Sequence, residues 1–412
     1  MLEPGANGQA PLSGVKVVDI ATFLAAPMCA MFLADFGADV IKVERPGTGD
    51  EVRYWGDNKN GVGLYNKVIN RGKRTITADL RTPLGVEILK RLIKDTDILV
   101  ENFRTGTLEG WGIGPDVLMA INPGLIIVRI TGFGQTGPNS PRPGFGTLAE
   151  AYAGYAHITG YPGQPPLLPS FGFADSSSGL MAAYLASIAL HERRRSGKGQ
   201  IIDLAIYETM LTLLGPQVIN YDQLGLVQER NGSRLPFTAP RNTYQTKDGH
   251  WVSIGGSAQS IFERICKALE VPHLVTDERF LNNRLRIKNS VALDEELQKA
   301  IRHFDRDPLI KLFIEHGAAI SPVNSVADIF ADKHIQSREN IVPIEDAELG
   351  TVRMQNVVGK LSRTPGKIEH AGAPVGAYNR QVLVEELGFD PAELEAAGIA
   401  LDAGGAVKTA AE

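Results

Sequence analysis

Asp175 stands at the place in the chain where a carboxylate is best set up for chemistry. It lies in PSFGFADSSSGLMAAYLASIALHERRR (169–195), where apolar residues recur at helical spacing after a Pro-, Gly- and Phe-rich approach. The pattern predicts a helix that starts at Asp175 and closes with basic residues and Gly197. The free N–H groups and the dipole of a helix start would keep the carboxylate ionised and fix its direction. Considered alone, an aspartate at this place is most often a helix cap.

A set of cations accompanies the predicted strands of the first 130 residues. It consists of Arg45, Arg71, Lys73, Arg74, Arg81 and Arg104. The whole chain carries 42 Lys and Arg against 47 Asp and Glu, a net charge of −5, which argues against nucleic acid or a membrane surface as a partner. An anionic ligand must therefore meet a local cluster, and a polyphosphate would need one of this kind. Taken singly, each of these residues is more often a solvated surface charge.

Two other patterns carry no chemistry. GFGQTG (132–137) matches the dinucleotide fingerprint G-x-G-x-x-G, but three prolines follow where that fingerprint needs a helix to hold a pyrophosphate. We interpret it as a flexible loop. The 8 histidines are too scattered to form a helical metal pair or a zinc module, so metal catalysis is not expected.

Short β-branched runs alternate with helical patterns in the first part of the chain. The runs lie at 15–20, 39–44, 76–80, 97–102 and 125–130, and helices are expected at 27–36 and 83–95. Strands separated by helices predict a mostly parallel sheet that is covered on both faces. Thr82 can cap the second helix, and Pro83 suits its first turn. Ligands bind beyond the carboxyl ends of such strands, which directs attention to the loops after Ile20, Glu44, Asn102 and Ile130.

A chain of 412 residues is too long for one ordinary core, so two domains are expected. Turn residues gather at 226–249, where the sequence predicts a linker. We expect a large Rossmann-like domain built from both chain ends, 1–224 and 326–412, and a smaller α+β domain at 225–325. The Gly- and Ala-rich tail 403–412 is expected to be disordered.

The cysteines and the chain start bear on location. Cys29 and Cys266 lie far apart in apolar helical patterns, so we expect buried, unpaired thiols in a reducing compartment. The start, MLEPGANGQAPLSG, has no basic region followed by an apolar run, and no run of eighteen apolar residues occurs. The expected location is cytoplasmic.

Five stretches of the chain resemble the class III coenzyme A transferases, the family of formyl-CoA transferase and carnitine CoA-transferase. They are DFGADVIKVERPGTGD (35–50), NRGKRTITADL (70–80), DILVENFRTGTL (97–108), the stretch around Asp175, and GKGQIIDLAIYETML (197–211). The likeness runs in matching order from residue 12 to about residue 390. It implies an α/β CoA-transferase of the CaiB/BaiF type that forms an interlocked homodimer, in which each chain threads through a ring made by the other.

The resemblance implies that Asp175 is a nucleophile. An acyl group would pass from its thioester to Asp175 as a mixed anhydride, and the released CoA thiolate would then attack the aspartyl carbonyl to leave an enzyme–CoA thioester. A carboxylic acid acceptor would run the same steps in reverse, so the implied reaction needs no metal and no redox cofactor. The residues implied to contact coenzyme A are Arg45, Ala78, Arg81, Asn102, Phe103 and Arg104, with Thr131 and Phe133 nearer the thioester. Arg45 and Arg81 would meet phosphate or adenine.

The chain departs from formyl-CoA transferase at several positions. Leu24 replaces a glutamine beside the active site, and Gly110 stands where an arginine is usual. The long Gly-rich lid is missing, with Gly255 and Gly256 as a shorter counterpart. The residues assigned to the substrate pocket or to oxyanion binding are Leu24, Phe145, Gly255 and Gly256.

Alpha-methylacyl-CoA racemases also resemble this chain. They carry an adjacent His-Asp pair where this chain has Phe145 and Gly146, so proton transfer beside the thioester would lack half of its machinery. A racemase-like isomerase and a non-catalytic CoA-binding protein are the alternatives to a transferase. The sequence identifies neither the acyl-CoA donor nor the acid that accepts the coenzyme.

Overall fold

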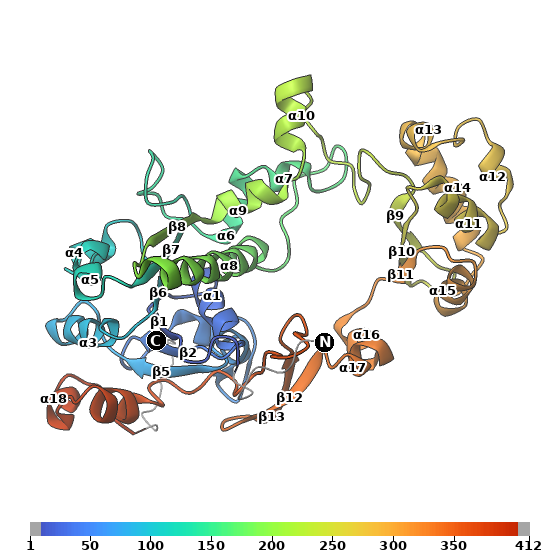
Figure 1. Cartoon of the computed structure of the whole chain (residues 1–412). Helices are drawn as coiled ribbons and strands as arrows, with labels where there is room; N and C mark the ends of the chain where they lie inside the picture. Colours follow the sequence, from blue (N-terminus) through green and yellow to red (C-terminus); the bar gives the residue numbers. More distant parts are fainter. Residues whose placement is uncertain (1–9, 403–412) are drawn as a thin grey trace. The chain divides into compact units, whose positions relative to one another are not determined.

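The computed structural model describes residues 10–402 and divides into two compact units (Figure 1). The first unit contains the residues up to Tyr155, Leu168–Val218 and the residues from Gln336 onward. The second contains Ala156–Leu167 and Ile219–Ile335. The expected domains, 1–224 with 326–412 and 225–325, stay predictions about parts that fold independently. The tail 403–412, expected to be disordered, lies outside the described residues.

A six-stranded parallel sheet forms the centre of the first unit, which confirms the predicted α/β architecture. Its strands are β1 (Lys16–Asp19), β2 (Asp39–Glu44), β5 (Lys73–Thr77), β6 (Ile98–Glu101), β7 (Ile126–Thr131) and β8 (Ile201–Ala205). Their spatial order is β5-β2-β1-β6-β7-β8. The chain runs outward from β1 in one direction and then restarts at β6 on the other side, so the order reverses between β1 and β6. Open sheets of this kind bind ligands at that reversal, beyond the carboxyl ends of the strands.

Each face of the sheet is buried under helices because successive strand residues point to opposite sides. Val17 packs into one core and Val18 into the other. The face that carries Val17 is covered by α1 (Ala25–Ala34), α6 (Gly146–Tyr152), α8 (Phe173–Ser196) and α9 (Ile206–Leu213) (Figure 1). The face that carries Val18 is covered by α3 (Pro83–Ile93), α5 (Pro115–Ile121), a π-helical turn (Arg380–Glu386) and α18 (Pro391–Ala396). α1 and α8 pack closely, since Gly179 has no side chain to separate them: a Cβ there would lie 2.7 Å from the carbonyl oxygen of Ala25.

Shorter elements complete the first unit. They are a 3-10 turn (Glu51–Tyr54), β3 (Asn58–Lys59), β4 (Val62–Gly63), α2 (Leu64–Ile69), α4 (Thr107–Gly110), β12 (Ile341–Asp346) and β13 (Gly350–Gln355). No helix within residues 10–402 is both long enough and apolar enough to cross a bilayer.

The second unit has its own core around a three-stranded antiparallel sheet of order β11-β10-β9. The elements lying wholly or mainly in it are α7 (Tyr155–Ile158), α10 (Gln217–Leu224), β9 (Arg241–Gln245), β10 (Trp251–Gly255), α11 (Gln259–Ala268), α12 (His273–Thr276), α13 (Asn283–Lys288), α14 (Ser290–Ile301), α15 (Arg306–Glu315), β11 (Ile320–Pro322), α16 (Val326–Ala331) and α17 (Lys333–Ser337). Arg286 is fully buried here, and its guanidinium donates to the carbonyl oxygens of Ala239, Phe280 and Ser257. That single side chain ties three loops together.

Most predicted elements are present, with shifts at their ends. The cap at Thr82 is confirmed, because its hydroxyl accepts the N–H of Gly85 at 3.1 Å. The strand predicted at 76–80 is wrong in its bounds, since β5 is Lys73–Thr77 and the chain has left the sheet by residue 78. The linker predicted at 226–249 contains β9.

Three of the predicted ligand cations belong to the fold instead. Arg71 makes a bidentate ion pair with Asp35, and Lys73 is buried against Asp19 at 2.9 Å. Arg74 pairs with two carboxylates, at the start of β2 and in the π-helical turn. The prediction that these cations serve a polyphosphate is wrong, because their charges already pair with carboxylates at the end of α1, on β1, on β2 and in the π-helical turn.

The C-terminal segment is bound to the edge strand of the parallel sheet through Asn379. The Asn379 amide oxygen accepts the N–H of Thr77 at 2.7 Å, and its amide nitrogen donates to the Thr77 hydroxyl and the Ala400 carbonyl. Asn379 is 2% exposed, so each of these partners would be left unsatisfied in a dry environment without it.

We expect Asn379→Ala to lower the free energy of unfolding by about 2–4 kcal/mol, since it removes three buried hydrogen bonds and strands their partners. Urea titration followed by circular dichroism measures the change. Asn58→Ala, at an exposed position, is the matched control and should leave the midpoint in place. Equal midpoints for both variants would contradict the assigned role of Asn379.

Candidate active site

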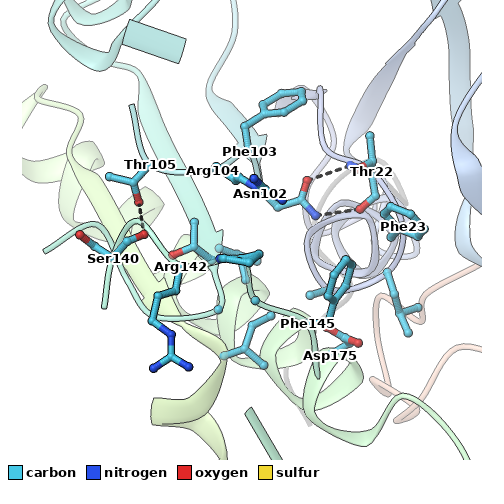
Figure 2. A pocket seen from close by; sticks show the side chains of 18 of the residues that line it. Thr22, Phe23, Asn102, Phe103, Arg104, Thr105, Ser140, Arg142, Phe145 and Asp175 are labelled. Carbon is cyan, nitrogen blue, oxygen red and sulfur yellow. Dashed lines mark hydrogen bonds between the residues drawn. The ribbon is translucent and has the colours of Figure 1, made fainter. Parts of the chain in front are cut away.

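The candidate site is a pocket of about 280 Å³ at the reversal of strand order between β1 and β6. The Asn102 side chain, just after β6, joins the two loops there: its oxygen accepts the N–H of Thr22 at 2.9 Å and its nitrogen donates to the Thr22 carbonyl at 2.7 Å. Figure 2 shows this paired contact on one side of the pocket and Phe145 with Asp175 on another. The pocket therefore lies where the sheet topology places a ligand site.

Asp175 enters the pocket from the first turn of α8. The cap position is Gly172, which has no side chain, and Asp175 is the third residue of the helix, so the prediction that it caps the helix is wrong. Its carboxylate accepts a hydrogen bond from the N–H of Gly146, the first residue of α6. A Cβ on Gly146 would lie 2.4 Å from the Asp175 Oδ2 atom, so only glycine leaves room for this contact.

The expectation that the start of α8 lowers the pKa of Asp175 and so favours its ionised form is also wrong. Burial and the nearby charge of Glu150 raise the pKa of Asp175 to about 6, and the Gly146 hydrogen bond offsets only part of that rise. Desolvation outweighs the helix dipole because the carboxylate lies among apolar and aromatic groups. A carboxylate with a raised pKa is a more basic and more nucleophilic group than a solvated one.

Glu150 is a site residue that the sequence analysis missed. It lies one turn after Gly146 on α6, is 2% exposed, and accepts the N–H of Ala174 at 3.1 Å. Burial raises its pKa, against the effect of that N–H. The available signal was a lone glutamate in the apolar helical run TLAEAYAGY, which is costly to bury unless it has a purpose.

The wall of the pocket opposite α8 is a loop in a strained conformation. Phe23 has φ +63°, which is rare for a bulky residue, and its N–H is held by the Asp50 Oδ1 atom at 3.0 Å. Lys42, fully buried, lies 3.0 Å from the other Asp50 oxygen and also donates to the Ala21 carbonyl. The Phe23 ring makes edge contacts with Trp55 and Phe145, with centroid distances of 5.8 and 6.2 Å. Aromatic side chains therefore line the approach to Asp175.

A second pocket of about 300 Å³ adjoins the first, since Thr22 and Phe103 line both. Of the residues expected to contact coenzyme A, the structure brings Arg45, Ala78, Arg81 and Phe103 together in this second pocket. Asn102, Phe103, Arg104 and Thr131 line the first. We refer to the two adjoining pockets together as the groove; Arg45 and Arg81 line one of them and Asp175 lines the other.

The cations along the groove differ in what they bind. Arg45 pairs with Glu51, and Arg81 pairs with Asp79 at 2.7 Å. Arg104 is exposed and meets no carboxylate within residues 10–402. Arg142, from the loop before α6, has its guanidinium 4.9 Å from the centroid of the Phe133 ring and also lines the Asp175 pocket (Figure 2).

The remaining predicted site residues are spread over the structure. Leu24 is buried and Phe145 is exposed, and both line the first pocket. The hydroxyl of Thr131 is buried with no hydrogen-bond partner in the described chain. Phe133 packs against two tyrosines of α6 and α9 and lines neither pocket.

Three further predictions concern the second unit, the metals and the thiols. Gly255 is the last residue of β10 in the second unit and Gly256 follows it; a Cβ on Gly256 would lie 2.5 Å from Ile265. Within residues 10–402, no group of three or more His, Cys, Asp or Glu side chains could hold a metal ion. Cys29 and Cys266 are buried free thiols, as expected.

The chain was compared with known proteins. The profile of CoA-transferase family III matches residues 12–379. Succinyl-CoA–D-citramalate CoA-transferase of Chloroflexus aurantiacus is 42% identical over 93% of this chain and 96% of that protein. The beta subunit of succinyl-CoA–L-malate CoA-transferase from the same organism is 39% identical over 93% and 96%. The crystal structure of a CaiB/BaiF family protein from Brucella suis is 35% identical, with a TM-score of 0.82 over 92% of this chain and all of that one.

The raised pKa of Asp175 makes the stability of the protein depend on pH. The pKa of Asp175 is about 6 in the folded protein and 3.8 in the unfolded chain. The protonated carboxyl therefore adds to the free energy of unfolding below pH 3.8, and this contribution is lost as pH rises through 6. Asp175→Asn removes that loss and is expected to raise the free energy of unfolding by about 2 kcal/mol at pH 8, with no gain at pH 4. Urea unfolding at both values measures the difference, with exposed Asp57→Asn as the control. A gain that is the same at pH 4 and pH 8 would refute the assignment.

Proposed function

Because this chain belongs to CoA-transferase family III, and is an enzyme that transfers coenzyme A from an acyl-CoA to a carboxylic acid, we propose that Asp175 carries the group in transit. The observation that carries the proposal is the Asp175 carboxylate in the pocket at the strand reversal, oriented by the N–H of Gly146. Its pKa, about 6, leaves it ionised at pH 7 and more basic than an exposed aspartate. These are the properties of a carboxylate nucleophile.

The reaction takes four substitutions at carbonyl carbon. An Asp175 oxygen attacks the donor thioester, the C–S bond breaks, and CoA leaves as a thiolate from a mixed anhydride. The thiolate attacks the aspartyl carbonyl, which releases the donor acid as its carboxylate and forms an aspartyl–CoA thioester. The acceptor carboxylate attacks this thioester to give a second anhydride and free thiolate. The thiolate then attacks the acceptor carbonyl, which releases the new acyl-CoA and restores Asp175.

The groove between the two pockets suits coenzyme A. Arg45 and Arg81 are proposed to meet its phosphates, exchanging part of their pairing with Glu51 and Asp79 for phosphate oxygens. The pantetheine arm would pass Ala78, Phe103 and Asn102, all at the ends of β5 and β6. The thioester would then lie near Thr131, whose unpaired hydroxyl can donate to it. Phe133 would act only by supporting this wall, since it packs beneath it.

The substrates are proposed to be succinyl-CoA and a short dicarboxylic acid. The relatives named above transfer CoA from succinyl-CoA to D-citramalate and L-malate, each an acid with a second carboxylate. Arg104 and Arg142 line the Asp175 pocket without a carboxylate partner in the described chain and can receive that second charge. Leu24 and Phe145 supply the apolar part of the pocket.

We propose that the enzyme is a cytoplasmic homodimer. An apolar row on α8, formed by Leu180, Tyr184 and Ile188, is 59%, 60% and 47% exposed in the single chain. Residues four apart lie on one face of a helix, so this row is continuous and suited to burial against a second copy. The two free buried thiols fit a reducing compartment.

The function is tested with purified enzyme, succinyl-CoA and a panel of dicarboxylic acids, with acyl-CoA products followed by chromatography. Enzyme incubated with succinyl-CoA and then hydroxylamine should carry a hydroxamate on Asp175, found by peptide mass spectrometry. Asp175→Ala should abolish both transfer and labelling while it still binds CoA. Full turnover by this variant would refute the mechanism, and no transfer by the unmodified enzyme to any acid would refute the substrate class.

The role of Arg45 is tested separately. Arg45→Ala should raise KM for the acyl-CoA about tenfold with kcat little changed, since a charged contact to phosphate is lost far from the reacting carbonyl. Arg195→Ala is the control because Arg195 is also an exposed arginine in a carboxylate pair. A fall in kcat alone would show that Arg45 does not bind the coenzyme.

A further inference from the structure

We propose that Glu150 is a positioning residue for the nucleophile: it occupies the N–H of Ala174 at the start of α8 and so leaves Asp175 to turn onto Gly146 and into the pocket. This inference rests on the proposed function, in which Asp175 is the nucleophile. Glu150 touches neither substrate nor reacting atom and acts through Asp175.

The burial of Glu150 requires an explanation. It is 2% exposed, its carboxylate accepts the N–H of Ala174 at 3.1 Å, and no ion pair within residues 10–402 includes it. A buried carboxylate without a cation costs several kcal/mol relative to an apolar side chain of that size. The other buried carboxylates around the sheet, such as Asp19, Asp35 and Glu44, all have a Lys or Arg partner.

Two contacts link α6 to the start of α8. The N–H of Gly146 is donated to Asp175, and the carboxylate of Glu150 receives the N–H of Ala174. Residues four apart lie on the same face of a helix, so Gly146 and Glu150 present both groups together. The free N–H groups at a helix start normally attract the nearest carboxylate. Here the cap position, Gly172, has no side chain, and the carboxylate of Glu150, from outside α8, accepts the N–H of Ala174 instead.

The charge of Glu150 also favours the reaction itself. In the free enzyme two carboxylates lie close together in a partly dry site, which raises the energy of the ionised pair. When Asp175 becomes an anhydride or a thioester, its charge is gone and the repulsion disappears. The neighbouring charge therefore destabilises the free nucleophile but not the covalent intermediates.

The other ionisable groups on the elements around α8 have separate partners or carry no charge. Tyr65 from α2 faces Asp175 and has a raised pKa because of burial and that carboxylate. α1 has Cys29 as its only ionisable side chain. On α9, Glu208 accepts the N–H of Ala205, and Tyr207 makes an edge-to-face contact with Tyr152. On β7 and β8 the ionisable side chains have their own partners, Arg129 with Glu101 and Glu109, and Asp203 with the N–H of Gln135.

Glu150→Gln separates charge from shape, since glutamine keeps an oxygen that can accept the Ala174 N–H. The acid limb of kcat/KM against pH reports the ionisation of the free nucleophile. In this variant the limb should move about one unit lower, and kcat at pH 8 should fall about three- to tenfold because the carboxylate is less basic. Glu208→Gln is the control, because Glu208 also accepts a backbone N–H at a helix start, and its profile should match the unmodified enzyme.

Glu150→Asp is the second variant. It keeps the charge but withdraws it by one methylene from Ala174, so kcat should fall at every pH while the acid limb stays in place. An unmoved limb in Glu150→Gln, or full kcat in Glu150→Asp, overturns the inference. Either result with an unmodified enzyme that transfers CoA, and an Asp175→Ala variant that does not, leaves the proposed function intact.

Discussion

A carboxylate in a partly dry pocket, with no ion-pair partner within residues 10–402, sets the conditions for the rest of this structure. Asp175 is raised in energy by burial and by the charge of Glu150, and one N–H, from Gly146, holds it in direction. A solvated carboxylate would be too weak a nucleophile, and one paired with arginine would be weaker still. The sheet order, the glycine at the start of α6, and the start of α8, where Glu150 rather than Asp175 accepts the N–H of Ala174, all keep Asp175 exposed to substrate and poorly compensated.

The opposite wall of the pocket depends on charges that are fully compensated. Burial opposes the ionisation of Asp19, but Lys42 and Lys73 together hold its pKa below the usual value. Lys42 also forms an ion pair with Asp50, and Asp50 accepts the N–H of Phe23. This contact holds Phe23 in a left-handed conformation that is unfavourable for a bulky residue. Strong ion pairs beneath the loop thus maintain the strain at its surface. Paired charges beneath the loop thus shape the site, whereas the carboxylate proposed to react, Asp175, has no ion-pair partner within residues 10–402.

The sequence predicted the features that depend on local patterns and missed those that depend on partners. The strands β1, β2, β6 and β7 and the cap at Thr82 follow from periodicity and side-chain chemistry within a few residues, and all are present. The family motifs identified Asp175, which spacing alone could not distinguish from a cap. Glu150 was missed because its significance lies in Ala174, which is 24 residues away. Arg71, Lys73 and Arg74 were misread because their carboxylates come from the end of α1, from β1 and from the far end of the chain.

The contact of Asn379 with Thr77 means that the first unit is assembled from segments separated by most of the chain. A ribosome completes the long segment of the second unit, Ile219–Ile335, before it makes the residues that close the edge of the parallel sheet. Until then the N–H of Thr77, on the edge strand β5, lacks its Asn379 acceptor. Synthesis therefore exposes an unfinished sheet for the time needed to add some three hundred residues, and a cell that makes this enzyme must protect that edge from neighbours during that interval.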